Sequence, residues 1–288
     1  MSAPAPTLGR LLGSWTPQWG VCAGLLLAAA AYLLALRRSR RRWPRQRAAL
    51  WLCGLVALAL ATMSGIDRYS ELLLSVHMLQ HLLLALAAPV LLLGGRPVGL
   101  ALACAPPATR RRLGVLLRSR AARAASTPVV GFLAFSVVIL ATHLTGVFEL
   151  ALREPAVHAL EHAAYLAAGL LFFAPILAAD PLPHRAGAIA RFCWLMGAMA
   201  VMAVPGALLT FATSVRYPHY LAPARALGRS ALADQQLAGV IMWIGGGIAM
   251  FALALGLTMQ AMLAEDRLQR RRERHAGAVD ALAPGAPR

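Results

Sequence analysis

Charge is scarce in this sequence, and lysine is absent. Charged residues make up 14% of the 288 residues, whereas hydrophobic residues make up 59%. Soluble globular chains do not show this balance, so the composition indicates an integral membrane protein. The 28 basic residues are all arginine, and they give a net charge of +17. Because they alternate with apolar segments of about 20 residues, they are interpreted as topology signals, and no nucleic-acid partner is expected.

Cysteine is also scarce, and the four cysteines form no Cys-x-x-Cys pair. Scattered cysteines in apolar segments are usually small packing residues, so neither a disulfide framework nor a thiolate metal site is expected. A signal peptide is not indicated either, because it would carry its positive charge before the apolar run. Only Arg10 precedes the apolar residues 20–36, whereas seven arginines follow within 37–47. This first apolar segment is therefore expected to be a retained span.

Seven apolar segments are long enough to cross the hydrocarbon core, for which a helix needs about 20 residues. They are 20–36, 48–66, 72–93, 127–146, 157–178, 190–212 and 236–263. The fold class is therefore predicted to be all-α, a polytopic membrane bundle of seven transmembrane helices. It divides into an N-terminal extracytoplasmic segment at 1–19, a transmembrane domain at 20–264 and a basic cytoplasmic tail at 265–288.

The arginines divide unevenly between the two sides of this predicted bundle. Twenty-two lie in one set of connections and six in the other. The arginine-rich set comprises 37–47, 94–126, 179–191 and the tail from residue 265. Cytoplasmic connections carry an excess of arginine, so the N-terminus is predicted outside and the C-terminus in the cytoplasm. The run Arg110–Arg123 is expected to lie on the anionic lipids of the inner leaflet.

Six of the eight histidines fall on the predicted outer side, five of them in helices. His77 and His81 are four residues apart and therefore share one helix face, as do His158 and His162. His143 lies about one turn before the outer end of its helix. Uncharged imidazoles in a low-dielectric interior need partners, and a metal ion satisfies several at once. These five residues are candidate metal ligands, and hydrogen bonding between helices is the alternative.

Neighbouring side chains favour copper over zinc. Imidazole binds copper, zinc and iron, whereas thioether sulfur prefers Cu(I). Met78 adjoins His77, and Met242 lies in the outer half of the last predicted span, so both are candidate thioether ligands, with packing as the alternative. Asp234 is expected either to cap its helix or to orient a metal-bound imidazole. Glu161 is expected to point off the face of His158 and His162 and to pair with another helix, and zinc remains the alternative ion.

Other functions of such histidines are alternatives to a metal carrier. His158-Ala-Leu-Glu-His162 matches the His-x-x-Glu-His pattern of zinc proteases, but a match of five residues is weak. Haem ligation of the cytochrome b kind would need histidines far apart along each helix. A seven-span zinc-dependent membrane hydrolase of the ceramidase type is the strongest alternative, because Asp67, Ser64 and Ser75 lie on the same predicted side.

Three motifs follow one another along the chain around these residues. They are His77-Met-Leu-Gln-His81-Leu-Leu-Leu with Pro89, His158-x-x-x-His162 with Phe172-Phe173-Ala-Pro175, and Tyr217-Pro-His-Tyr220 with Asp234-Gln-Gln-Leu-Ala-Gly-Val-Ile-Met242-Trp243. Together they resemble the CtaG family of multi-span assembly factors for bacterial haem–copper cytochrome c oxidase. The resemblance covers about residues 50–265 and is distinct from the single-span copper chaperone that sometimes bears the same name.

The resemblance implies a multi-pass protein of the bacterial inner (plasma) membrane that helps to mature the oxidase. Oxidase subunits are then the expected protein partners, and anionic lipids are expected to meet the arginine-rich loops. Combined with the histidines, this predicts a non-enzymatic assembly factor that binds or relays copper near the outer face. The expected roles are primary ligands for His77 and His81, further ligands for His143, His158 and His162, ligand orientation for Asp234, and transient thioether donation for Met78 and Met242.

Overall fold

The computed structural model describes residues 6–39 and 42–282, and within these ranges it contains helices and loops but no strand. Of the expected N-terminal segment and C-terminal tail, residues 1–5 and 283–288 lie outside the described residues. Helices are the expected response to long apolar runs, because a helix satisfies its backbone groups internally where no water is available.

Six helical segments are long and apolar enough to cross a membrane. They are Trp19–Arg38 (α2), Arg45–Met63 (α3), Leu74–Cys104, Pro155–Leu177 (α12), Ala188–Thr210 (α13) and Ala231–Arg270. The third joins α5 (Leu74–Leu82), η1 (Leu83–Ala87), α6 (Ala88–Gly94) and α7 (Pro97–Cys104). The sixth joins α15 (Ala231–Val240), η3 (Ile241–Gly245) and part of α16 (Gly246–Leu282). These segments confirm the all-helical, multi-pass character predicted from the sequence.

The predicted segment 127–146 forms α10 (Pro128–Leu144), an apolar helix of 17 residues. This is shorter than the six candidate spans, although α10 packs against both α12 and α13 inside the bundle. The count of seven spans and the orientation of the termini therefore stay predictions.

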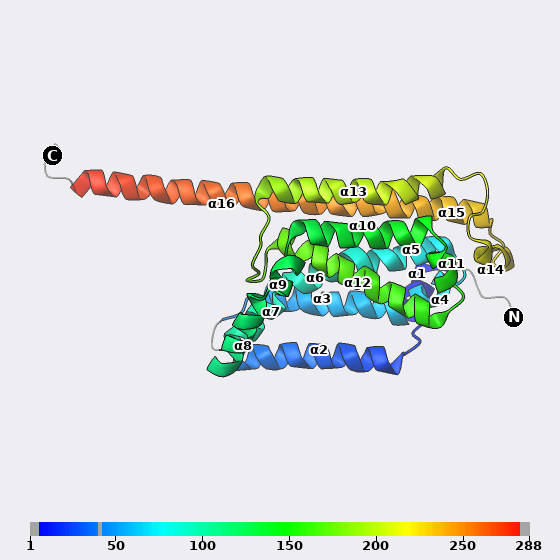
Figure 1. The fold of residues 1–288 in the computed structure, drawn as a ribbon, viewed down its shortest axis with the longest axis horizontal. Coiled ribbons are helices and arrows are strands. Elements are labelled where there is room, and N and C mark those ends of the chain that lie inside the picture. The colour runs from blue at the N-terminus through cyan, green and yellow to red at the C-terminus, as the bar shows by residue number, and fades with distance from the viewer. Residues whose placement is uncertain (1–5, 40–41, 283–288) are drawn as a thin grey trace.

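The long helices lie side by side, and short helices collect at the two ends of the bundle (Figure 1). One end carries α1 (Leu8–Gly13), α4 (Gly65–Ser70), α11 (Val147–Ala151), η2 (Pro218–Tyr220) and α14 (Leu221–Ala226). The other end carries α8 (Pro107–Leu117) and α9 (Arg120–Ala125), and α16 projects beyond the bundle on that side (Figure 1). The arginine run 110–123 thus lies at the end of the bundle opposite α4 and α11.

Two π-helical segments interrupt the helices that carry candidate ligands. The segment η1 begins two residues after His81, and η3 contains Met242. Single π-helical turns inside α-helices are frequent at functional sites. The helix α12 packs closely against the first of them, because a Cβ added at Gly169 would clash with the backbone oxygen of Ala85 in η1 and lie 2.6 Å from Cγ of Pro89 in α6. Glycine at this position lets α12 approach η1 and α6, and so brings its histidines near α5.

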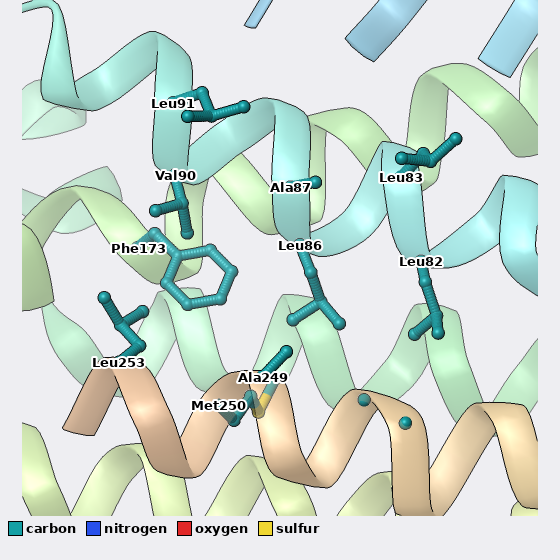
Figure 2. Close-up of a pocket in the computed structure, with 12 residues that line it drawn as sticks. Leu82, Leu83, Leu86, Ala87, Val90, Leu91, Phe173, Ala249, Met250 and Leu253 are labelled. Carbon is teal, nitrogen blue, oxygen red and sulfur yellow. The ribbon is translucent and has the colours of Figure 1, made fainter. Parts of the chain in front are cut away.

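An apolar cavity of about 360 Å³ lies between the η1–α6 region and α16. Figure 2 shows Leu86 and Val90 projecting toward Met250 and Leu253 across this cavity. Among the described residues, no histidine lines it. Met250 is 1% exposed, so it is a buried methionine away from the candidate ligands.

Candidate metal centre

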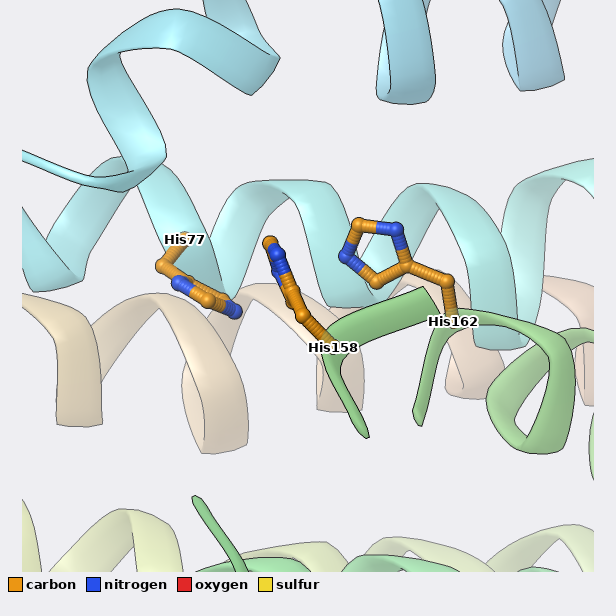
Figure 3. Close-up of side chains that lie close together, drawn as sticks. All are labelled: His77, His158 and His162. Carbon is orange, nitrogen blue, oxygen red and sulfur yellow. The ribbon is translucent and has the colours of Figure 1, made fainter. Parts of the chain in front are cut away.

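Three imidazoles from two helices gather near the end of the bundle that carries α4 and α11. His77 lies on α5, and His158 and His162 lie on successive turns of α12. One ring nitrogen of each lies within 4.8 Å of the other two. Figure 3 shows His77 reaching toward His158 and His162, which rise from α12. Converging imidazole nitrogens of this kind suit a transition-metal ion.

His81 and Glu161 extend this group toward the interior. The Nε2 atoms of His77 and His81 are 3.0 Å apart, and Oε2 of Glu161 lies 3.8 Å from Nε2 of His81. The expected pairing of Glu161 with another helix is therefore confirmed, because His81 lies on α5. Position 161 follows 158 by three residues, and residues three or four apart are neighbours on a helix surface. That spacing keeps Glu161 on the side of α12 that turns toward α5.

Several polar atoms of the cluster lack hydrogen-bond partners within the described part of the chain. They are Nδ1 of His81, Nε2 of His158 and of His162, and both carboxylate oxygens of Glu161. Buried polar atoms normally have partners, and leaving one without costs about 1–3 kcal/mol. Nitrogen and oxygen donors in this state fit a bound metal ion, which would satisfy several of them together.

Tyr220 sets the tautomer of His77. The Tyr220 hydroxyl donates to the carbonyl oxygen of Ser70 at 3.0 Å and lies 2.9 Å from Nδ1 of His77. Its single proton is directed at Ser70, so Nδ1 of His77 must be the donor in the second contact. Burial raises the pKa of Tyr220 well above its ordinary value of 10.0, so the hydroxyl keeps its proton. Nε2 of His77 then carries the lone pair, and it faces Nε2 of His81 at 3.0 Å.

His143 lies deeper and joins the cluster through His81. The ring centroids of His81 and His143 are 6.1 Å apart. Nδ1 of His143 lies 2.9 Å from the carbonyl oxygen of Ile139, and Nε2 lies 3.3 Å from Sδ of Met78. Met242 lines a small cavity together with Met78, His81 and His143. The structure thus brings together the five histidines and two methionines that the sequence singled out.

Asp234 contacts Ser75 and not an imidazole. Its carboxylate accepts hydrogen bonds from the hydroxyl of Ser75 and from the backbone N–H of Ser75, the latter at 3.2 Å. These bonds hold the first turn of α5, the helix that carries His77. The expected cap of its own helix is instead Ser230, whose hydroxyl accepts from the N–H of Ala233. Asp234 therefore positions α5, a helix that carries candidate ligands, through its contacts with Ser75.

The serine and aspartate side chains that a hydrolase would use are engaged away from the imidazoles. The Ser64 hydroxyl caps α4 by accepting from the N–H of Ile66. Asp67 accepts from Nε2 of Gln80 at 2.9 Å and from Nε2 of Gln18 at 3.3 Å. Ser75, as above, bonds to Asp234. This geometry does not favour the hydrolase alternative.

A cavity of about 340 Å³ opens beside the outer imidazoles and is lined by His77 and His158. Glu71, His219 and the exposed Arg153 also line it. His219 lies 3.2 Å, through Nε2, from the carbonyl oxygen of Glu71. An ion in this cavity would meet imidazole nitrogens without crossing the core of the bundle.

Residues 30–263 match the family described as cytochrome c oxidase caa3 assembly factor (Caa3_CtaG). The chain belongs to this family. The matched region confirms the resemblance carried by the three motifs, and it includes the five histidines of the cluster. Membership of Caa3_CtaG supports a role in oxidase assembly.

Mycobacterial proteins of unassigned function are similar to this Caa3_CtaG chain over most of its length. Uncharacterized proteins of Mycobacterium bovis and Mycobacterium tuberculosis are each 33% identical over 282 residues, which cover 94% of the chain. An uncharacterized protein of Mycobacterium leprae is 29% identical over the same length. The chain spans 43% of the length of these relatives. No solved structure matches it.

Proposed function

We propose that this chain is a non-enzymatic assembly factor that binds copper and passes it to a subunit of cytochrome c oxidase. The observation that carries the proposal is the convergence of His77, His158 and His162, with one ring nitrogen of each within 4.8 Å of the others. Imidazole is a good ligand for copper ions. Family membership supplies the oxidase as client, and copper is the cargo that a haem–copper oxidase needs.

The cluster suits a carrier better than a permanent metal site. A carrier must release its ion, so its ligands must exchange with those of the client. His77 and His158 line an accessible cavity, and His158 and His162 are only partly buried. Ligands presented by a client could therefore approach the ion from this side.

The cluster is proposed to face the outer side of the bacterial plasma membrane. In this arrangement α10 is the fourth of seven spans, the N-terminus lies outside and the C-terminus lies in the cytoplasm. Support comes from the arginines of α8, α9 and α16, which lie at the end of the bundle opposite the histidines (Figure 1). These arginines would contact anionic lipids of the inner leaflet.

The test is the metal content of the purified full chain. The double variant His158→Gln/His162→Gln removes two ligands of the outer group, and His184→Gln is the matched control. His184 bonds to Ser126 near the arginine-rich end, away from the cluster. The wild type and the control should retain their copper, and the double variant should hold less of it. Equal copper in all three folded proteins would contradict the proposal, and stoichiometric zinc in place of copper would also contradict it.

The assembly role has a separate test in cells. Membranes from cells that lack the gene should contain less copper-loaded oxidase, measured from the haem and copper spectra of the enzyme. A gene encoding the double variant should not restore it, whereas the His184→Gln gene should. Normal oxidase in cells without the gene would overturn the assembly role.

A further inference from the structure

Beneath the outer imidazoles, two atoms face each other that each carry a lone pair and no proton. Nδ1 of His143 lies 2.9 Å from the carbonyl oxygen of Ile139, which can only accept, and 3.0 Å from the hydroxyl of Thr142, whose own proton points to the carbonyl oxygen of Val138 at 2.7 Å. The Tyr165 hydroxyl, 3.4 Å away, gives its proton to Thr142 at 2.7 Å, so the proton of a neutral ring sits on Nδ1. Nε2 of His143 then carries a lone pair, and it lies 3.3 Å from Sδ of Met78. A thioether sulfur has no proton to donate. No hydrogen bond can therefore form between these two atoms while the ring is neutral.

Protonation of His143 would allow a hydrogen bond to Met78, but it would place a charge in the protein interior. An imidazolium could donate from Nε2 to the Met78 sulfur. However, His143 is 2% exposed and Met78 is 1% exposed, so the charge would be removed from water. Burying a charge without an opposite charge is strongly unfavourable. An ion that accepts electron pairs from both nitrogen and sulfur satisfies the same two atoms with the ring neutral.

The surrounding space suits a single soft ion. A cavity of about 10 Å³ lies beside these atoms and is lined by Met78, Met202, Met242, His81, His143 and Tyr165, with three other residues. A cavity of this size holds about one water-sized particle. Three of the lining residues are methionines, whose thioether sulfur prefers a soft cation such as Cu(I).

We infer that this cavity is a second metal station, specific for Cu(I), with His143 and Met78 as ligands and Met202 and Met242 as further sulfur donors. The inference rests on the proposed function, because copper would reach the cavity from the outer imidazoles past His81. The distance of 3.3 Å between Nε2 of His143 and Sδ of Met78 suits two ligands of one metal ion. With bonds of about 2.0 Å to nitrogen and about 2.3 Å to sulfur, a tetrahedral ion holds the two atoms about 3.5 Å apart.

The test uses the full chain loaded with Cu(I) under anaerobic conditions and examined by X-ray absorption at the copper edge. The wild type should show sulfur as well as nitrogen neighbours. Met78→Leu, a substitution that nearly conserves volume, should lose the sulfur signal and weaken Cu(I) binding about tenfold in competition with a Cu(I) chelator. Met250→Leu is the matched control, because Met250 is equally buried but lines the apolar cavity of Figure 2. It should behave like the wild type.

The outcomes separate the second station from the outer cluster. Retention of sulfur-bound copper by His158→Gln/His162→Gln would support the station, since its ligands are intact in that variant. Copper bound by the wild type through nitrogen alone would overturn the station and leave the proposed function standing. An unchanged sulfur signal in Met78→Leu would also overturn it. A wild-type chain that binds no copper would overturn the proposed function itself.

Discussion

Tyr220 holds His77 in the tautomer that carries its proton on Nδ1, so that an unprotonated Nε2 faces His81. The hydroxyl of Tyr220 gives its proton to Ser70 and receives one from Nδ1 of His77, at 3.0 Å and 2.9 Å. A ligand imidazole is commonly oriented in this way by a partner on its other nitrogen. The connection joins η2, which lies outside the candidate spans, to the candidate metal centre on α5.

Tyr220→Phe should weaken copper binding about tenfold, because partners on the far nitrogen of a ligand histidine contribute on this scale. The affinity would be measured by competition with a copper chelator. Tyr217→Phe is the control, since the Tyr217 hydroxyl donates to the backbone carbonyl of His143 at 3.2 Å and not to a ring nitrogen. Equal losses in the two variants would indicate general loosening of the fold, and would contradict an orienting role for Tyr220.

Asp234→Ala should destabilise the chain by about 1–3 kcal/mol, because it leaves the buried N–H and hydroxyl of Ser75 without their acceptor. Copper stoichiometry should stay at the wild-type value. Unfolding in detergent would measure the first quantity, and metal analysis the second. Gln236→Ala, which removes one bond to the carbonyl oxygen of Ala212, is a milder control. A stable Asp234→Ala chain that binds no copper would instead make Asp234 part of the site.

Much of the architecture follows from local patterns in the sequence. Apolar runs predict the long helices because the backbone needs no other partner there. Helical spacing alone also places His77 with His81, and His158 with His162. Boundaries were less predictable. The segment expected at 48–66 ends at Met63, because the hydroxyl of Ser64 starts the separate helix α4.

Contacts between distant helices could not be predicted in the same way. The bonds between Ser75 and Asp234 join positions 159 residues apart, and no local pattern encodes such a pairing. The contact of His143 with Met78 likewise depends on how α10 packs near α5. Tyr220 is part of the third sequence motif, yet its role becomes visible only through its two hydrogen bonds. Sequence patterns thus indicated the candidate ligands, whereas the packing of the helices determines which of them lie in the outer group and which lie beside Met78.

Asp67 should make stability depend on pH. Burial raises the pKa of Asp67 from 3.8 to about 6, while bonds from Gln80 and Gln18 act in the opposite direction. The folded chain then holds this proton more tightly than the unfolded chain. Stability from this group is therefore full below about pH 4 and is lost as the pH rises to about 6, by at most about 3 kcal/mol.

Asp67→Asn should remove this component of the pH dependence, since the amide does not titrate. Unfolding of both chains in detergent, measured at several values between about pH 4 and about pH 7, gives the difference in slope. The variant should gain stability relative to the wild type as the pH rises. Parallel curves for the two proteins would contradict the raised pKa.

Glu161→Gln should weaken copper binding about tenfold, which lowers the stabilisation by saturating copper by about 1.4 kcal/mol. Glu161 is 4% exposed, and its Oε2 lies 3.8 Å from Nε2 of His81. Its carboxylate would help to neutralise a bound ion, whereas an amide cannot. The metal-free variant should be at least as stable as the wild type, because a buried carboxyl group is replaced by a neutral one. Thermal unfolding with and without copper measures both effects.

Glu149→Gln is the matched control for this prediction. Glu149 bonds to the exposed guanidinium of Arg153 at 2.8 Å, so its replacement should leave the copper-induced shift unchanged. If Glu161→Gln showed the full wild-type shift, the carboxylate would have no part in binding the ion. If it lost stability without copper, the pairing of Glu161 with His81 would be structural. The two results are distinguishable because the first concerns the increment on adding copper and the second the metal-free baseline.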